Sequence, residues 1–210
     1  WREAGVKVDY LPLATDPDVF RIIPAHKAFN VVISGTPSPP RLAILETLAE
    51  FEPAIFGPRQ LWEKYPQWMK YYQGCVIGEE ELNKLYNLTR VLVDISSPQN
   101  LDSANFTVFN GLASGCVLIT NYKPALDELF RPEDPLVVYG NLEELHELTA
   151  RILAASDAAQ MMLAQAQRES ILDRHTFKQR AERILAELDG CPRLEMPEAE
   201  RAQWADLLAH

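Results

Sequence analysis

The chain has 210 residues, 47% of them hydrophobic, which suits one large globular domain or one and a half small ones with an adequate core. Its formal net charge of −10 excludes a broad nucleic-acid-binding groove, although a single cationic pocket for a nucleotide would not show in that sum. No apolar run is long enough to cross a bilayer and no signal peptide is evident, so we expect a cytoplasmic protein without a membrane span.

Short apolar runs alternate with stretches of helical spacing along most of the chain. The runs predict a first strand over residues 6–10, which the prolines and aspartates after it break, and then six further strands. These six cover residues 29–34, 53–57, 75–77, 90–95, 116–120 and 136–139. Helices are predicted between them over residues 41–50, 58–72, 79–87, 105–113 and 125–130.

After the last strand the pattern turns helical. Helices are expected over residues 141–155 with Asn141 as N-cap, 157–170 and 175–189, followed by a break at 190–197 and an amphipathic segment at 198–210. The succession predicts an α/β fold, with a Rossmann-like three-layer domain over residues 26–190 that contains a mainly parallel sheet of about six strands. A helical C-terminal tail follows, with an amphipathic helix in residues 191–210.

The chain opens on Trp1 and not on methionine, so we expect a fragment or a processed piece. Residues 1–25 would then be a linker and the end of a missing N-terminal domain. Part of the working machinery would lie in that domain.

Two strand–helix junctions are candidate ligand sites. The first follows the strand at residues 29–34, which is ended by Gly35. The proline-rich turn after Gly35 cannot continue the strand, and a helix begins near Arg41. A cation in the first turn of a helix opposes the helix dipole. The Arg41 side chain is therefore expected either to point to solvent or to wait for an anion.

The helix predicted over residues 58–72 carries a row of four aromatic residues, which are Trp62, Tyr65, Trp68 and Tyr71. A row of aromatics at this spacing is usually part of the core and only occasionally a stacking platform for a ligand. We therefore expect these side chains to be buried.

The second junction lies within residues 90–124, where strand, polar loop, helix and strand make a βαβ unit. Asp102 and Ser103 are available as N-caps of its helix, and Gly115 is a natural stop. One helical face is expected to carry the apolar residues Phe106, Phe109, Leu112 and Ala113. The free N–H groups and partial positive charge of a helix start suit a phosphate, although most such junctions in α/β domains bind nothing.

Several kinds of catalytic site are absent from the sequence. Ser114 lacks the glycine two places earlier that a nucleophile elbow requires, because Leu112 stands there. Neither a P-loop nor the Gly-x-Gly-x-x-Gly of dinucleotide-binding folds is present. Cys75, Cys116, Cys191 and the four histidines lack metal-ligand spacing, so we expect no metal, and we expect the cysteines to be reduced core residues.

Over about residues 10–155 the chain resembles the C-terminal half of GT-B glycosyltransferases, in particular CgeB-like members with a glycosyl transferases group 1 C-terminal domain. The resemblance lies in the order of short motifs, which are LPLATDPDVF, a strand ending in SG, a proline-rich turn with an arginine, PAIFG, GCVIGEEELNKLYN, VLVDIS and TVFNGLASGCVLIT. It implies a domain that binds a nucleoside diphosphate sugar as substrate and uses no cofactor. It also implies that the missing N-terminal domain holds an unknown acceptor and the catalytic base.

The resemblance implies two contacts with the donor diphosphate. Gly35 and Thr36 would let the diphosphate approach the backbone, with Arg41 as a charge partner. The start of the helix after the second junction would offer its N–H groups to the phosphates. The residues of that helix start are Ser103, Ala104, Asn105, Phe106 and Thr107.

The nucleoside would lie beside Val76, Ile77 and Gly78, and Asn110 would meet the ribose. The family typically reads Arg-x-Phe-Glu where this chain reads TVFN, so both the arginine and the ribose-binding glutamate are replaced. The Asn110 amide can hydrogen-bond a hydroxyl, but it lacks the charge-assisted strength of a carboxylate.

The sequence therefore leaves two functions open. The first is the donor-binding domain of a GT-B glycosyltransferase, and the second is a degenerate Rossmann-like domain that acts as a non-catalytic interaction module. The surviving Gly35 and Arg41 favour the first, whereas the replacement at Asn110 favours the second. A sugar-nucleotide epimerase on the same fold would need catalytic carboxylates that the sequence does not reveal.

Overall fold

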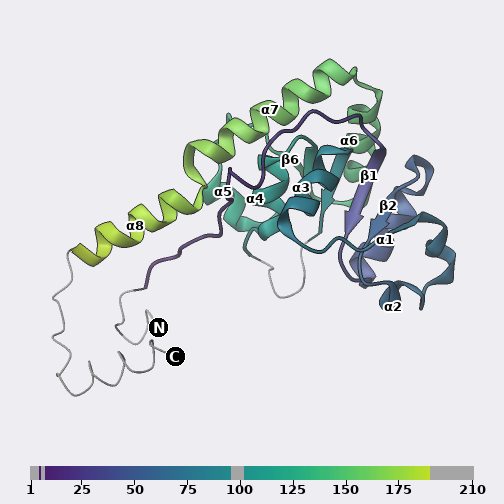
Figure 1. Cartoon of the computed structure of the whole chain (residues 1–210), viewed down its shortest axis with the longest axis horizontal. Helices are drawn as coiled ribbons and strands as arrows, with labels where there is room; N and C mark the ends of the chain where they lie inside the picture. The colour runs from purple at the N-terminus through teal and green to yellow at the C-terminus, as the bar shows by residue number, and fades with distance from the viewer. Residues whose placement is uncertain (1–4, 6–7, 96–101, 190–210) are drawn as a thin grey trace.

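The computed structural model describes residues 5, 8–95 and 102–189, which form three layers around one sheet (Figure 1). Neighbouring strands pair in parallel, in the order β3-β2-β1-β4-β5-β6. The strands are β1 (Phe29–Ser34), β2 (Ala54–Phe56), β3 (Tyr72–Gly74), β4 (Thr89–Asp94), β5 (Val117–Asn121) and β6 (Val137–Tyr139). The predicted α/β Rossmann-like class is confirmed.

Helices cover both faces of this sheet. One face carries α3 (Glu79–Asn87), α4 (Phe106–Ala113) and α5 (Pro124–Leu129). The other face carries α1 (Pro39–Thr47), η2 (Ala49–Phe51), α2 (Arg59–Trp62), η3 (Pro66–Tyr71) and α6 (Leu142–Ala154). The two long helices α7 (Asp157–Arg174) and α8 (Phe177–Asp189) follow, which confirms a helical C-terminal segment.

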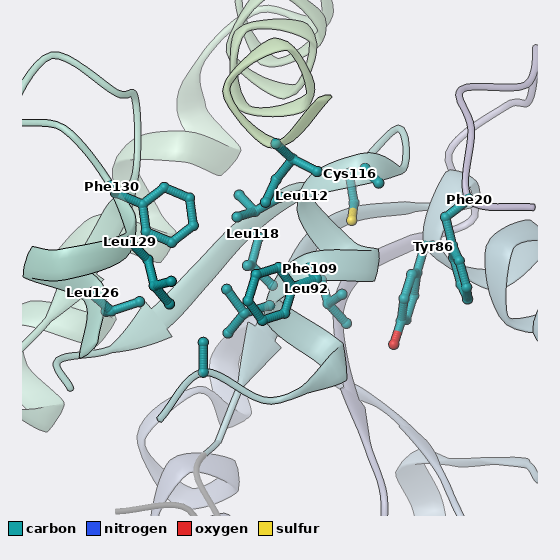
Figure 2. Close-up of a cluster of buried hydrophobic side chains, with 14 of the residues drawn as sticks. Phe20, Tyr86, Leu92, Phe109, Leu112, Cys116, Leu118, Leu126, Leu129 and Phe130 are labelled. Atoms are coloured by element: carbon teal, nitrogen blue, oxygen red, sulfur yellow. The ribbon is translucent and has the colours of Figure 1, made fainter. Parts of the chain in front are cut away.

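Two hydrophobic clusters hold the layers together, because successive strand residues point to opposite faces. Val32 and Leu92 join the cluster under α4, while their neighbours Val31 and Val91 join the cluster under α1 and α6. Figure 2 shows the first of these clusters, in which Phe109 of α4 lies beside Leu92. Both faces of the inner strands are thus buried, as in other parallel sheets.

The predicted boundaries are right for α3 and wrong around β3. Residues 58–72 form two short helices and not one, because Pro66 has no N–H to continue a helix and Tyr65 before it is not helical. The third strand is Tyr72–Gly74, so the strand predicted over residues 75–77 is wrong. Residue Tyr72 pairs with Ile55 of β2, and it is this pairing that defines the strand.

The aromatic row between β2 and β3 belongs to the core, as predicted. Trp62 and Trp68 are buried in the second cluster, and Tyr65 and Tyr71 pack against it. The Trp68 and Tyr71 rings stack with centroids 6.1 Å apart. These rings hold η3 against the second hydrophobic cluster.

The N-terminal segment is not the predicted strand. Residues 8–10 have no regular structure, and residues 6–7 lie outside the described part of the chain. The segment instead packs along the domain: Ala14 and Phe20 are buried, and Thr15 forms an isolated parallel bridge with Thr176. This packing ties the first residues to the last helices.

The cysteines differ in their environment. Cys116 is free and buried, as predicted, and burial raises its pKa to about 12, which keeps the thiol protonated. Cys75 is free but exposed, so its prediction as a core residue is wrong. It follows β3 in a loop and has no strand to bury it. Cys191, like the amphipathic helix predicted over residues 191–210, lies outside the described residues.

Helices α7 and α8 continue in one direction, and α8 projects from the body of the domain beside the N-terminal segment (Figure 1). Arg180 of α8 donates from Nε to the Pro12 carbonyl at 2.9 Å, which holds the segment to the helix. Large apolar side chains are exposed on both α8 and the N-terminal segment, and we call five of them the apolar α8 surface. They are Tyr10, Leu11, Ile184, Leu185 and Leu188.

Gly57→Ala should lower the free energy of unfolding by about 1–3 kcal/mol, the usual cost of overpacking. A Cβ at Gly57 would lie 2.2 Å from the Gly35 carbonyl oxygen and 2.7 Å from Trp62 Nε1, so the backbone would have to shift. The matched control is Gly140→Ala, where the nearest atom is the flexible Glu144 carboxylate at 3.3 Å. Urea denaturation measures both variants, and equal stability of the two would contradict the expectation.

Candidate functional site

The carboxyl ends of β1 and β4 form the candidate site. These two strands are neighbours, but the chain leaves β1 toward β2 on one side and reaches β4 on the other, so the strand order reverses between them. Ligands of open α/β sheets bind at the carboxyl ends of strands where the order reverses. The two junctions identified in the sequence meet at this edge.

Backbone hydrogen bonds that involve three glycines hold the turn after β1 in place. The Gly35 N–H donates to the Phe56 carbonyl at 2.8 Å, and the Gly57 N–H donates to the Gly74 carbonyl at 2.8 Å. Trp62 Nε1 donates to the Gly35 carbonyl at 3.0 Å. Gly35 has φ +113°, a conformation that favours glycine, so the backbone can turn sharply here.

Arg41 folds back over this turn and does not point away to solvent. Its Nη1 donates to the Thr36 carbonyl, and its guanidinium lies so close to Gly35 that a Cβ there would be 3.0 Å from Nη2. Arg41 Nε is buried and has no hydrogen-bond acceptor in the described part of the chain. Burial lowers the pKa of Arg41, while the nearby charge of Asp94 acts to raise it. The predicted trio of Gly35, Thr36 and Arg41 is therefore brought together.

The start of α4 lies at the same edge of the sheet. Asn105 is its N-cap, and not Asp102 or Ser103, because Asn105 Oδ1 accepts from the Val108 N–H at 3.2 Å. Among the described residues, no acceptor pairs with the N–H groups of Phe106 and Thr107. Within the part of the chain that the structure describes, two N–H groups of the first turn are thus without a partner.

Phe106 and Ala104 show which side of this helix start is open. Ala104 is buried, whereas Phe106 is 51% exposed. The prediction that Phe106 shares the buried face of the helix with Phe109 is therefore wrong. The side chains of Ser103 and Thr107 are half-buried. The exposed side of the first turn therefore includes a large apolar ring.

Tyr86 of α3 connects the two junctions. Its hydroxyl lies near the side chains of Ser34, the last residue of β1, and Thr107, in the first turn of α4. Tyr86 is fully buried, and this burial raises its pKa above the ordinary value. The Gly35 turn and the start of α4 are therefore close neighbours in space.

The residues predicted to lie beside a base occupy the loop from β3 to α3. Ile77 is 80% exposed, and its N–H donates to Glu81 Oε2 at 3.3 Å. Gly78 is the residue before α3 and has φ +102°. Val76 packs against the first hydrophobic cluster. These three residues lie at the same sheet edge as Gly35, two strands along.

Asn110, predicted to meet a ribose, is 6% exposed within α4. Its Oδ1 accepts a hydrogen bond from Thr15 Oγ1 at 2.9 Å, and its carbonyl accepts one from Ser114 Oγ at 2.8 Å. The side-chain oxygen is therefore already engaged with the N-terminal segment. A ligand hydroxyl would have to accept from the side-chain NH₂ group.

Sequence reasoning missed a buried ion pair next to α4. Asp94 ends β4 and Lys123 precedes α5; they are 1% and 0% exposed, with Oδ2 and Nζ 2.5 Å apart. Thr120 Oγ1 donates to the same Oδ2 at 2.9 Å, and Tyr139 OH donates to the Asp94 carbonyl at 3.3 Å. Charged residues at a strand end and before Pro124 were the available signal, but the partners are 29 residues apart.

No group of three or more histidine, cysteine or carboxylate side chains in residues 8–95 and 102–189 is arranged to hold a metal ion. None of the helices within these ranges combines the length and the apolar character that a bilayer crossing requires.

A family model described as glycosyl transferase-like matches residues 41–186, which is more than half of the chain. None of the curated proteins compared with the chain matches it. Many solved structures do match. The sequence identities of those described below are 11–15%, so these matches show a shared fold and nothing more.

Sucrose-phosphate synthase from Thermosynechococcus elongatus matches with a TM-score of 0.62 and 15% identity, over 85% of this chain and 51% of that one. HepE from Anabaena, in complex with UDP-glucose, matches with a TM-score of 0.64 and 11% identity, over 85% and 56%. The chain thus spans about half the length of these structures. The C-terminal domain of LpcC, a glycosyl transferase group 1 family protein from Francisella tularensis, gives 0.56 and 13%, over 78% of this chain and 99% of that one.

Proposed function

Because the chain belongs to the glycosyl transferase-like family, we propose that it is the donor-binding C-terminal domain of a GT-B glycosyltransferase. The GT-B resemblance itself is confirmed by the family match and the fold, whereas the CgeB-like subtype stays a prediction. The domain would bind a nucleoside diphosphate sugar and use no cofactor of its own. The sugar would pass to an acceptor held by a second domain.

The observation that supports this proposal most is the pairing of Arg41 with an open helix start. A half-buried cation with an unpaired Nε lies at the same edge of the sheet as a helix start whose Phe106 and Thr107 N–H groups have no partner among the described residues. Negative charge builds up on a nucleoside diphosphate as it leaves the sugar, and fixed N–H donors and a guanidinium stabilise that charge. The Arg41 guanidinium lies directly over Gly35, so a phosphate that approaches this turn would meet the cation there.

UDP is the first nucleotide to test, because the HepE structures hold UDP or UDP-glucose. In this proposal the diphosphate lies between the Gly35 turn and the start of α4. The base lies toward the exposed Ile77, and the ribose meets the Asn110 NH₂ group. The sugar and the acceptor stay open.

A second domain is the proposed partner of the apolar α8 surface. Five large apolar side chains exposed on one projecting helix and its neighbouring segment are characteristic of an interaction site. In the proposal they contact the N-terminal GT-B domain, which also supplies the catalytic base. The cytoplasmic location expected from the sequence also stays a prediction.

The alternative function, a non-catalytic interaction module, is favoured by one observation. Asn110 replaces the family glutamate, and its oxygen is committed to Thr15. A site that has lost its ribose contact would keep the fold without binding a donor.

Arg41→Ala should weaken UDP binding by about tenfold to a hundredfold, the range for loss of a hydrogen bond to a charged group. Isothermal titration calorimetry with UDP, GDP and related nucleotides makes the measurement. The matched control is Arg131→Ala, an exposed arginine beyond α5 that pairs with Asp173 at 3.4 Å. Micromolar binding lost only in Arg41→Ala supports the proposal, whereas a wild-type protein silent toward every nucleotide supports the interaction module.

A further inference from the structure

The Asp94–Lys123 pair is connected to the proposed phosphate site through a single side chain. Asp94 uses Oδ2 for Lys123 and Thr120, and its other oxygen, Oδ1, accepts from Asn105 Nδ2 at 2.8 Å. Asn105 in turn caps α4, with Oδ1 accepting from the Val108 N–H at 3.2 Å. The chain of bonds therefore runs from a buried lysine to the first turn of α4.

The same pair also fixes the neighbouring helix start. Lys123 is the residue before α5, and its Nζ bonds to Thr120 Oγ1 at 3.2 Å as well as to Asp94. The Ala125 N–H, in the first turn of α5, donates to the Asp102 carbonyl at 3.1 Å. Asp102, four residues before α4, and the start of α5 are thus joined by a backbone hydrogen bond, in addition to the link through the ion pair.

Stability alone is a poor reason for this arrangement. A buried ion pair can often be replaced by apolar residues of similar volume without loss of stability, because both charges must be desolvated. What apolar residues cannot supply here is the acceptor for Asn105 Nδ2. That acceptor sets the orientation of the Asn105 amide, and the amide orients the first turn of α4.

We propose that Asp94 and Lys123 are positioning residues that orient the start of α4 through Asn105, for a diphosphate that binds there. This inference rests on the proposed function for the identity of the ligand. Neither residue contacts the ligand, because both are enclosed by the protein. Lys123 holds Asp94 in place, Asp94 holds Asn105, and Asn105 holds the helix start.

Two double variants test the proposal. Asp94→Leu with Lys123→Met removes both charges and the acceptor for Asn105, whereas Asp94→Asn with Lys123→Met removes both charges but keeps an amide oxygen in the acceptor's place. The first should weaken UDP binding about tenfold, and the second should restore most of that loss. Asp94→Leu with Lys123→Met binding UDP as tightly as wild type would overturn the proposal.

Amide hydrogen exchange gives a second measurement that needs no ligand. The Val108 N–H should exchange about five to ten times faster in the leucine–methionine variant than in the asparagine–methionine variant, since its cap is lost. The Leu112 N–H, in the last turn of α4, serves as the internal control for global unfolding. Unchanged Val108 exchange overturns the proposal, even if the wild-type protein binds no nucleotide and the proposed function fails.

Asn105→Ala covers the case in which a double variant does not fold. Asn105 is half-buried at the surface, so its truncation removes the cap without leaving a charge buried. It should accelerate Val108 exchange and weaken UDP binding to the same extent as the leucine–methionine variant. Wild-type exchange and affinity in Asn105→Ala would show that the bond from Asp94 to Asn105 orients nothing, and would overturn the proposal.

Discussion

Lys123→Met alone should destabilise the domain by about 3–5 kcal/mol, the usual cost of breaking a buried ion pair. Asp94 would then keep a negative charge at 1% exposure without its cation. Thr120 and Asn105 would still donate to the carboxylate, but two neutral hydrogen bonds do not replace an ammonium group 2.5 Å away. Guanidinium denaturation at neutral pH measures the change.

The control for this prediction is Lys178→Met. Lys178 is 85% exposed and lies 3.9 Å from Glu182, so its loss should leave the free energy of unfolding almost unchanged. Adding Asp94→Leu to Lys123→Met should recover most of the lost stability, because no charge then remains buried. A Lys123→Met protein as stable as wild type would contradict this prediction.

The stability of the domain should also fall as the pH drops below 6.5, because of His175. Burial lowers the pKa of His175 to about 4, and the neighbouring Arg180 and Arg174 add to the effect while Asp134 opposes it. His175 Nε2 lies 2.9 Å from the Leu129 carbonyl, and Arg180 Nη2 lies 2.8 Å from Nδ1. Since Arg180 can only donate, Nδ1 must accept, and the ring is neutral.

The sign follows from the two pKa values. An unfolded chain has His175 near pKa 6.5, so between pH 6.5 and 4 the unfolded state binds the proton and the folded state does not. The stabilisation is complete above pH 6.5 and is lost toward pH 4, by about 3 kcal/mol at 1.36 kcal/mol for each pH unit. The measurement is the difference in unfolding free energy between wild type and His175→Gln across this range, which cancels other titrating groups. A difference that does not change with pH would contradict the prediction.

The sequence by itself determined the elements whose signals are local. Helix α3 was predicted at its exact bounds, because its acidic first turn and its apolar Leu82, Leu85 and Tyr86 lie within nine residues. Strands β1 and β4 were found within a residue, since apolar runs of that length are distinctive. The junction at Gly35 and Arg41 was likewise visible from neighbouring residues.

Features that depend on partners far along the chain were decided only by the tertiary structure. Strand β3 exists because Tyr72 pairs with Ile55, and its three residues carry no periodic signal of their own. Asn105, and not the equally suitable Asp102 or Ser103, became the N-cap, with its amide also bound to Asp94. A local pattern offers several candidates for such a role, and only the fold selects among them.

The range over which each interaction acts explains what the sequence and the tertiary structure each contributed to the candidate site. Helix periods, glycine turns and proline breaks act over a few residues, so they are written in the sequence and predict a parallel α/β domain with two open junctions. Burial and pairing of charges depend on chain segments that the fold brings together, such as Asp94 with Lys123 and Thr15 with Asn110. The sequence therefore predicted which two junctions make up the candidate site, and the tertiary structure decided which side chains hold those junctions in place.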